Sequence, residues 1–542
     1  MSPHANPPGE ENPSQTSMET CDVVVIGAGF SGLYAVHRFR EMGMSVIGIE
    51  AGSDVGGTWY WNRYPGARCD IPSLSYSYTW SPELSKTWRW SEKYAAQPEI
   101  LSYINHVADR YDLRGLIRFN TKVSSAVYDE ATETWLITTD QGSRIRTRYC
   151  LLATGNLSVP NMPRIPGMAS FKGPIYHTGK WPKERIDFTG LRVGVVGTGS
   201  SAVQAIPMIA KEAEQLYVFQ RTPNYSVPAI NVPLTDADHR QFNESIATFV
   251  ESLDSFGRVP PDAAQAPVPS PDEQRQVFQA AWEKGGASSF LHAFPNVLTS
   301  EEVNEGAAAF VKEKIRQIVQ DPATADALCA TNSLLGVKRL CVDTGYFQTY
   351  NKANVTLVSL KQQPLETITA NGIKTSQGEY ELDALVLATG FDALTGAILA
   401  IDIQGKDGAS LKEAWSEGPS SYLGLMVSGF PNIFTVTGPG SPSVIGNVLQ
   451  HGQHHVEYIA DLIAAMHRMG KKTVDVEPKA QDEWTAHVAQ VADQTLFPKA
   501  SSWYTGDNIP GKPRVFMPYV GHSYRKTCAN IAAQGYTGFV FK

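Results

Sequence analysis

The sequence is poor in cysteine, and no two cysteines stand close together. Its 542 residues include six, at positions 21, 69, 150, 329, 341 and 528, and none forms a CxxC pair. This spacing indicates neither a zinc site nor a redox dithiol. Flavin disulfide reductases depend on such a pair, so its absence argues against that class. Reduced thiols are typical of cytosolic proteins.

Long apolar runs and export signals are also missing. No apolar stretch reaches the roughly 18 residues that are needed to span a bilayer. The first twenty residues are polar and rich in Pro, Ser and Glu, so we expect residues 1–20 to form a disordered arm and not a signal peptide. The C-terminal residues Val540, Phe541 and Lys542 match no targeting tripeptide. We therefore expect a soluble, cytoplasmic protein.

Charge and composition narrow the class further. A net charge of −8 argues against nucleic acid or an anionic membrane as the main partner. No obligate protein partner is indicated. Hydrophobic residues at 42% and charged residues at 18% are typical of a globular enzyme. The length predicts two or three domains with sizeable cores.

A first nucleotide-binding signature lies near the N-terminus. Residues 22–26 form a valine-rich run that predicts a buried parallel strand, and residues 33–42 have helical periodicity. Between them lie Gly27, Gly29 and Gly32, which allow a tight turn and the close approach of a pyrophosphate to the helix N-terminus. A second strand at 45–49 ends in Glu50, an acceptor for ribose hydroxyls.

Two glycine- and aromatic-rich stretches follow, at residues 56–59 and 64–70. One interpretation is that Trp59, Trp61 and Tyr64 are ordinary core aromatics and that Asp70 is a turn cap. A helix is predicted at 98–111 and a small antiparallel ribbon at 117–127, 135–139 and 144–153. The stretch at 153–156 closes this unit.

A second signature starts at residue 192. The valine-rich strand 192–196 precedes Gly197, Gly199 and Ala202, and the strand 216–219 is followed by Arg221. A cation where the first unit has an acid favours the 2′-phosphate of NADPH over NADH. The alternative is that Arg221 is a solvated charge at the end of a strand.

The α/β pattern is then interrupted. Residues 230–330 read as a helical insertion with a proline-rich extended loop at 259–271 and a helix at 300–319. The pattern resumes at 336–340, and a buried strand is predicted at 382–387. Three histidines, His451, His454 and His455, share a predicted helix, but no nearby carboxylate completes a metal site with them.

The stretch between the two signatures, FKGPIYHTGKWP, supplies Phe171, Gly173, His177, Trp181 and Pro182 in a fixed pattern. This pattern resembles the fingerprint of the Baeyer–Villiger monooxygenases of the phenylacetone and cyclohexanone type. The resemblance covers nearly the whole chain. It implies an α/β fold with two Rossmann-like domains, one for FAD and one for NADP, and a helical insertion in the NADP domain. We assign residues 21–160 and 381–542 to the FAD domain, 161–229 and 331–380 to the NADP domain, and 230–330 to the insertion.

The resemblance also implies site residues. In the FAD domain the cofactor-binding residues are Gly27, Gly29, Phe30, Ser31, Gly32, Glu50, Gly57, Thr58, Trp59, Arg68, Cys69, Asp70 and Tyr76. On the NADP side they are Thr198, Gly199, Ser200, Ser201, Gln204, Arg221, Thr222, Lys338, Arg339 and Trp503. Arg339 and Asp70 are the catalytic pair, and His177 is expected to be a hinge between the domains. The turn at 438–443 is expected to influence substrate selectivity.

The implied reaction uses NADPH, FAD and O2 to convert a ketone to an ester or lactone, through a C4a-peroxyflavin and a tetrahedral Criegee intermediate. The nearest alternative is a flavin-containing monooxygenase or amine N-hydroxylase that oxidises nitrogen or sulfur. These share both nucleotide folds but typically lack the counterparts of Trp181-Pro182 and Arg339. A flavin-binding redox sensor without catalytic activity is the alternative from a different class.

Overall fold

A computed structural model describes residues 18–253, 259–329 and 334–542. Most of the arm expected at 1–20 lies outside the described residues. The first strand, β1 (Glu19–Ile26), begins two residues before the expected domain start. Alternate side chains of β1 point to opposite faces of the sheet. Val23 and Val25 belong to one hydrophobic cluster, and Val24 and Ile26 belong to another. The strand is therefore buried on both faces, as its valine run predicts.

The first sheet has eight strands in the order β17-β4-β5-β6-β1-β2-β3, with β18 beside β6. Its other strands are β2 (Val46–Ile49), β3 (Ile117–Arg118), β4 (Val123–Asp129), β5 (Thr134–Thr139), β6 (Arg144–Leu152), β17 (Asp402–Gln404) and β18 (Ile433–Thr435). The prediction of a single strand at 117–127 is wrong, because these residues belong to two strands, β3 and β4. The strand β3 pairs in parallel with β2, whereas β4 pairs antiparallel with β5. Between them the chain leaves the edge of the sheet at β3 and re-enters near the opposite edge, where β4 lies beside the edge strand β17.

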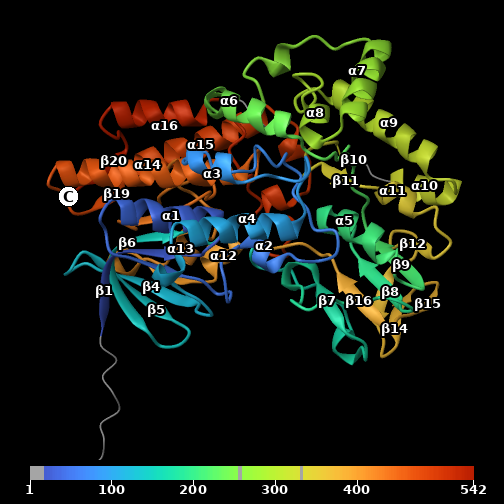
Figure 1. Ribbon diagram of the computed structural model, residues 1–542, viewed down its shortest axis with the longest axis horizontal. Coiled ribbons are helices and arrows are strands. Elements are labelled where there is room, and N and C mark those ends of the chain that lie inside the picture. Colours follow the sequence, from blue (N-terminus) through green and yellow to red (C-terminus); the bar gives the residue numbers. More distant parts are fainter. Residues whose placement is uncertain (1–17, 254–258, 330–333) are drawn as a thin grey trace, which may run out of the picture.

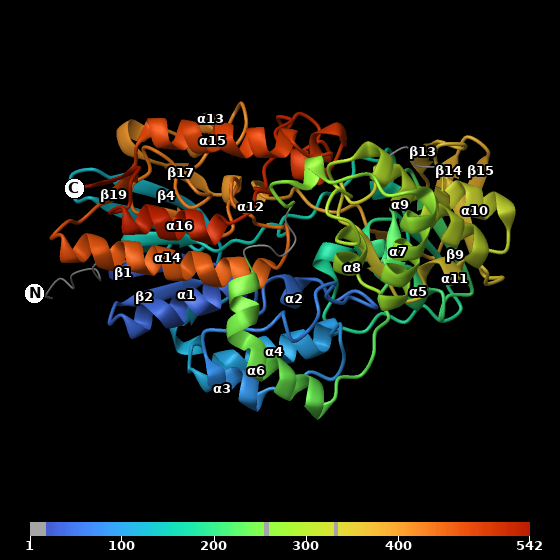
Figure 2. The same ribbon diagram turned by 90° about the horizontal axis from the view of Figure 1, so that it is seen from above.

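Helices cover this sheet from both ends of the sequence (Figure 1). They are α1 (Phe30–Glu41), α2 (Thr58–Trp61), α3 (Pro82–Thr87), α4 (Gln97–Arg110), α12 (Gly396–Leu399), α13 (Leu411–Ala414), α14 (Val448–Arg468), α15 (Pro478–Asp493) and α16 (Tyr524–Ala533). The helices α1 and α14 lie side by side in both views (Figures 1 and 2). The last strand, β20 (Phe539–Phe541), pairs antiparallel with β19 (Val474–Val476). Segments far apart in the sequence thus form one unit.

The second sheet is parallel throughout, in the order β12-β9-β8-β16-β7. Its strands are β7 (Ile175–His177), β8 (Arg192–Val196), β9 (Gln215–Gln220), β12 (Val355–Ser359) and β16 (Ala384–Leu387). The helix α5 (Ser200–Ile209) follows β8. Since β16 pairs with β7 and β8, the chain returns to the first unit after Leu387, and the expected boundary at 381 falls too early.

Smaller elements complete the second unit. A three-stranded antiparallel sheet contains β13 (Leu365–Ile368), β14 (Gly372–Thr375) and β15 (Gly378–Glu381). The strand β10 (Ser226–Pro228) pairs with β11 (Cys341–Asp343), which precedes α11 (Tyr346–Thr349). The α/β pattern expected to resume at 336–340 therefore resumes as β11, directly after Arg339 and Leu340.

The insertion is helical, as expected. It contains α6 (Asp236–Ser252), α7 (Pro271–Lys284), α8 (Ala287–Leu291), α9 (Glu301–Ile318) and α10 (Pro322–Cys329). The first of these helices, α6, crosses over the first unit beside α3 and α4 (Figure 2). There the backbone N–H of Trp90 donates to His239 Nε2 at 3.1 Å. The insertion thus contacts both units, which its position in the sequence does not indicate.

Candidate active site

The first glycine loop is shaped to receive a phosphate group. Gly27 has φ +106°, and a Cβ there would lie 2.4 Å from the carbonyl oxygen of Ala153, so only glycine fits. The helix α1 begins at Phe30, and Gly29, its N-cap residue, has no side chain to cap it. Its first N–H groups are therefore available to an anion.

Glu50 connects this loop to the next one. One carboxylate oxygen accepts from the N–H of Ala28 at 2.7 Å, and the other accepts from the N–H of Gly52 at 2.7 Å. Burial raises the pKa of Glu50, although these backbone hydrogen bonds act in the opposite direction. Each oxygen keeps a lone pair. The carboxylate fits the expected role as an acceptor for ribose hydroxyls.

The second glycine signature lies against the first. The N–H of Gly56 donates to the carbonyl of Ala28 at 3.0 Å. Trp59 Nε1 donates to the Tyr76 hydroxyl at 3.0 Å, and the ring of Tyr76 stands edge-on to Phe30 with centroids 5.4 Å apart. Of the other expected residues, Cys69 is buried next to Asp70, Thr58 is exposed, and Ser31 lies against Gly452 of α14.

Asp70 and Arg339, 269 residues apart in sequence, form a bidentate ion pair. Arg339 Nε donates to Asp70 Oδ2 at 2.7 Å, and Nη2 donates to Oδ1 at 2.6 Å. Nη1 donates to the carbonyl of Val444 at 2.9 Å. Burial acts to lower the pKa of Arg339, but the charge and hydrogen bonds of Asp70 outweigh it, so the pKa is raised and the guanidinium stays charged. About a quarter of each side chain is exposed, at 25% and 23%.

The second glycine loop resembles the first. The helix α5 starts at Gly199 without a side-chain cap in the described ranges, and a Cβ at Gly199 would meet nothing within 4 Å. Thr198 Oγ1 donates to the carbonyl of Thr222 at 3.0 Å, which ties the loop to the end of β9. The hydroxyl of Ser200 lies 3.3 Å from Cys341 Sγ.

Two cations meet beside this loop. Burial lowers the pKa of Lys338, and the nearby charge of Arg221 lowers it further. Lys338 also lines a small cavity with Pro223 and Asn224, which follow Arg221 in sequence. Neither Lys338 nor Arg221 forms an ion pair within residues 18–253, 259–329 and 334–542. Two adjacent cations without acidic partners suit an anionic ligand such as a 2′-phosphate.

Gln204 and Arg68 have protein partners between the two units. Gln204 Oε1 accepts from the Tyr64 hydroxyl at 2.8 Å and from the Arg68 N–H at 3.2 Å, while Nε2 donates to the Arg68 carbonyl at 3.0 Å. The Arg68 side chain pairs with Glu92 at 2.6 Å. Gly66 packs so closely that a Cβ there would lie 2.4 Å from the Gln204 carbonyl oxygen. Both residues were expected at a cofactor, and here they join the units.

The linker residues lie at the edge of the second sheet. His177 ends β7, its Nδ1 accepts from the N–H of Gly179 at 2.9 Å, and its Nε2 lies 3.2 Å from the Thr389 hydroxyl. That hydroxyl donates to the carbonyl of Asn161 at 2.7 Å, so one neutral tautomer with the proton on Nε2 satisfies the network. Burial lowers the pKa of His177. The histidine therefore joins the two segments where the chain crosses between units.

The other linker residues are structural. Trp181 is buried in the core of the second unit, with its ring 5.4 Å from that of Tyr176, and Pro182 follows it. Gly173 packs against the carbonyl of Asp383, and Phe171 packs against a neighbouring cluster.

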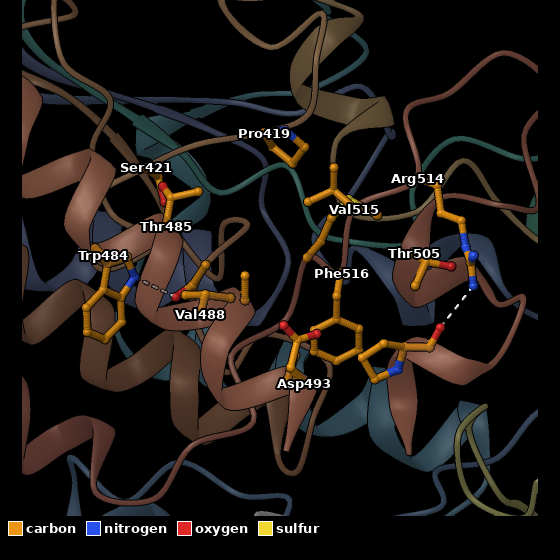
Figure 3. Close-up of a pocket in the computed structure, with 15 residues that line it drawn as sticks. Pro419, Ser421, Trp484, Thr485, Val488, Asp493, Thr505, Arg514, Val515 and Phe516 are labelled. Atoms are coloured by element: carbon orange, nitrogen blue, oxygen red, sulfur yellow. Dashed lines mark hydrogen bonds between the residues drawn. The ribbon is translucent and has the colours of Figure 1, made fainter. Parts of the chain in front are cut away.

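A cavity of about 340 Å³ is lined by Gly440 of the turn at 438–443 and by residues of α15 and the segment 498–517 (Figure 3), and neither Asp70 nor Arg339 is among its lining residues. Trp484 lines it and donates to the carbonyl of Gly440 at 3.0 Å, and Arg514 donates to the carbonyl of Pro498 at 3.0 Å (Figure 3). The described residues contain no group of three or more His, Cys, Asp or Glu that could hold a metal, the histidines of α14 included. No helix in the described ranges is long and apolar enough to cross a membrane.

Two residues that the sequence did not single out lie near the ion pair. One is Val444, through its carbonyl, and the other is the buried Tyr504, whose pKa is raised by burial and lowered in part by the charge of Arg339. A backbone carbonyl leaves no signal in a sequence. The aromatic pair Trp503-Tyr504 was noted only for its tryptophan, which is half-buried and lies 4.2 Å from the Tyr504 ring.

Comparisons with known proteins agree with this geometry. Residues 24–250 match the family model described as pyridine nucleotide-disulphide oxidoreductase. The chain is 43% identical to a Baeyer–Villiger monooxygenase from Pseudooceanicola batsensis, over 96% of both chains. It is 41% identical to cyclohexanone 1,2-monooxygenase from Acinetobacter sp., again over 96% of both. A solved structure, an oxidized steroid monooxygenase bound to NADP, matches with a TM-score of 0.91 and 47% identity, over 96% of this chain and 99% of that one.

Fold and site together define an oxidoreductase with two dinucleotide-binding units. Full-length similarity at this level makes the assignment specific, and the chain belongs to the Baeyer–Villiger monooxygenase family. The α/β fold with two Rossmann-like units, expected from the sequence, is confirmed.

Proposed function

We propose that this protein is an NADPH-dependent, FAD-containing Baeyer–Villiger monooxygenase that converts ketones to esters or lactones. The observation that carries the proposal is the bidentate pair of Arg339 and Asp70, which joins the segment after the second FAD signature to the segment that reaches the NADP side. Full-length similarity to Baeyer–Villiger and cyclohexanone monooxygenases supports it. When bound, NADPH supplies a hydride and FAD supplies the activation of O2.

The chain's own residues have separate tasks in this reaction. The N-terminus of α1 and Glu50 hold the FAD pyrophosphate and ribose, and the N-terminus of α5 holds the pyrophosphate of NADPH. Arg221 and Lys338 bind the 2′-phosphate. Arg339 presents a fixed positive charge to oxygen atoms that become negative as the ketone carbonyl is attacked. Asp70 aims that charge through two short bonds.

The proposed setting is the cytoplasm, with a small ketone and O2 as the only partners. We assign FAD to the first unit, NADPH to the second, and the change of unit to residues 388–394 in place of 381. The turn at 438–443 contributes to substrate selectivity, because the carbonyl of Val444 just beyond it binds Arg339.

A product assay tests the proposal. The purified protein is incubated with NADPH and O2 and with a panel of linear, cyclic and aromatic ketones, and in parallel with a tertiary amine and a sulfide. We expect one ester or lactone for each NADPH consumed with at least one ketone class, and a strong preference for NADPH over NADH. Formation of N-oxide with no ester from any ketone would favour the flavin-containing monooxygenase alternative. NADPH oxidation without any oxygenated product would favour the redox sensor.

A further inference from the structure

A short parallel ladder determines where the two cations proposed for the 2′-phosphate stand. The strands β10 and β11 (Figure 1) pair in parallel, with Ser226 opposite Cys341. Arg221 shortly precedes β10, and Lys338 and Arg339 shortly precede β11. Because the strands are parallel, both basic segments enter the ladder from the same end. The register of β10 on β11 therefore sets the distance between Arg221 and Lys338.

One buried carboxylate holds this register. Asp343, at the end of β11, is 7% exposed, and the hydroxyl of the fully buried Ser226 donates to its Oδ2 at 2.6 Å. Asp343 Oδ1 accepts from the N–H groups of Gly345 at 3.0 Å and Tyr346 at 3.2 Å, at the start of α11. All three partners donate, as an acceptor-only carboxylate requires. The Asp343 side chain thus joins the start of β10 to the start of α11.

The ladder itself has few backbone bonds. Each strand has three residues. The N–H of Cys341 donates to the carbonyl of Tyr225 at 3.1 Å, and the N–H of Ala229 donates to the carbonyl of Asp343 at 2.9 Å. A pair of strands without further neighbours is marginally stable. The contact between Ser226 and Asp343 therefore contributes a large share of what keeps β10 in place.

The same ladder is tied to the glycine loop of the second unit. Asn224 Nδ2 donates to Cys341 Sγ at 3.1 Å, and that sulfur lies 3.3 Å from the hydroxyl of Ser200 at the N-terminus of α5. The carbonyl of Thr222, next to Arg221, accepts from the hydroxyl of Thr198 in this loop at 3.0 Å. A shift of β10 along β11 therefore moves the cations relative to the helix that is proposed to hold the pyrophosphate.

We propose that Ser226 and Asp343 are positioning residues through which the protein distinguishes NADPH from NADH. Their contact keeps Arg221 and Lys338 at a spacing at which both cations reach one 2′-phosphate. The inference rests on the role proposed above for these two cations. A site that is arranged before its ligand arrives loses less freedom on binding, so loosening the contact weakens the hold on the 2′-phosphate. A cofactor without this phosphate is not affected.

Ser226→Ala tests the proposal, because it removes the hydroxyl and leaves the backbone ladder and the other two bonds of Asp343 in place. Binding of NADP+ and of NAD+ to the oxidised holoenzyme is measured by isothermal titration calorimetry. We expect the Kd for NADP+ to rise about five- to tenfold, because a hydrogen bond to a charged group is lost, and the Kd for NAD+ to stay unchanged. In turnover the change should appear in the KM for NADPH and not in kcat.

A conservative variant and a matched control accompany this test. In Asp343→Asn the amide nitrogen can donate to the Ser226 hydroxyl, and the remaining oxygen still accepts from the two N–H groups of α11, so the loss of NADP+ affinity should be smaller than in Ser226→Ala. The control is Thr375→Val, which removes a buried hydroxyl in β14 that donates to the carbonyl of Gly378 at 3.1 Å. It should lower the Tm but keep the parental ratio of the two dissociation constants.

The outcomes separate this inference from the function on which it rests. If Ser226→Ala and Asp343→Asn both keep the parental ratio of the two dissociation constants, the contact is only structural and the proposal is overturned, even where the Tm falls. If Ser226→Ala does not fold, Asp343→Asn alone decides, by the same criterion. A parent protein that binds NADP+ and NAD+ equally well would refute the proposed role of Arg221 and Lys338, and the inference with it.

Discussion

Removing the Arg339 side chain is expected to separate NADPH consumption from ester formation. Arg339→Ala deletes the bonds of 2.6 and 2.7 Å to Asp70 and the bond of 2.9 Å to Val444. A preorganised charge at a developing oxyanion is commonly worth about 2.7–4 kcal/mol, so ester formation should fall by about 10²–10³-fold. The cations proposed for NADPH, Arg221 and Lys338, are unchanged. NADPH should therefore still be oxidised, with its electrons released as hydrogen peroxide.

Two further variants distinguish charge from geometry. Arg339→Lys keeps the positive charge but loses the planar fork that matches both oxygens of Asp70. Asp70→Ala keeps the guanidinium and its bond to Val444 but removes the partner that aims it. We expect ester formation to be intermediate in Arg339→Lys. Asp70→Ala should be milder than Arg339→Ala on oxygenation and should also slow the oxidation of NADPH.

The assay follows ester, hydrogen peroxide and NADPH in the same sample. The matched control is Arg316→Ala, which removes an exposed arginine paired with Asp326 at 3.1 Å, where little change is expected. If Arg339→Ala forms ester at a near-parental rate, a fixed cation is not what stabilises the negative oxygen, and the assignment of Arg339 is wrong. A sulfide assay would then show whether an oxygen transfer that needs no anion persists.

Three more outcomes are expected. Arg221→Ala should raise the KM for NADPH and leave that for NADH little changed, because a lost bond to a charged group costs about 1.5–3 kcal/mol; equal use of both cofactors by the parent would contradict this. Burial lowers the pKa of His177 in the fold from 6.5, so the unfolded chain binds its proton more readily and stability falls as the pH drops below 6.5. His177→Asn, which can still accept from the N–H of Gly179, should therefore make the decline of Tm shallower between about pH 7 and 5; an unchanged slope would show that His177 does not titrate in this way. Gln204→Leu removes three hydrogen bonds between the units. It should lower the Tm and the yield of ester per NADPH oxidised, while the FAD content stays unchanged. A parental Tm would mean that the interface does not depend on this amide.

Periodicity predicted most of the regular elements well. The strand at 192–196 matches β8 at both ends, and the helix at 300–319 matches α9 within one residue at each end. Both have strong local signals, a valine run after a polar stretch and a serine cap before an apolar stripe. The Asp70–Arg339 pair could be anticipated only through the family resemblance, since 269 residues separate its members.

How distant segments pack against one another could not be predicted from the sequence. The packing of α6 on the first unit depends on its contact with Trp90, which local periodicity does not encode. The split of 117–127 into β3 and β4 depends on which strand each half pairs with. Gln204 is expected at the cofactor only through the family resemblance, and its hydrogen bonds to the backbone of Arg68 could not be predicted from the sequence.

The nesting of the two sheets has a consequence for synthesis on the ribosome. The second sheet needs only strands between residues 175 and 387, so it can close once β16 has emerged. The first sheet begins with β1 but gains β17 and β18 only when the chain has reached Thr435. Domains usually fold in the order in which they are made. Here the first sheet is started first but completed last. The end of β6 that pairs with β18 stays unpaired until the strands of the second sheet have been made.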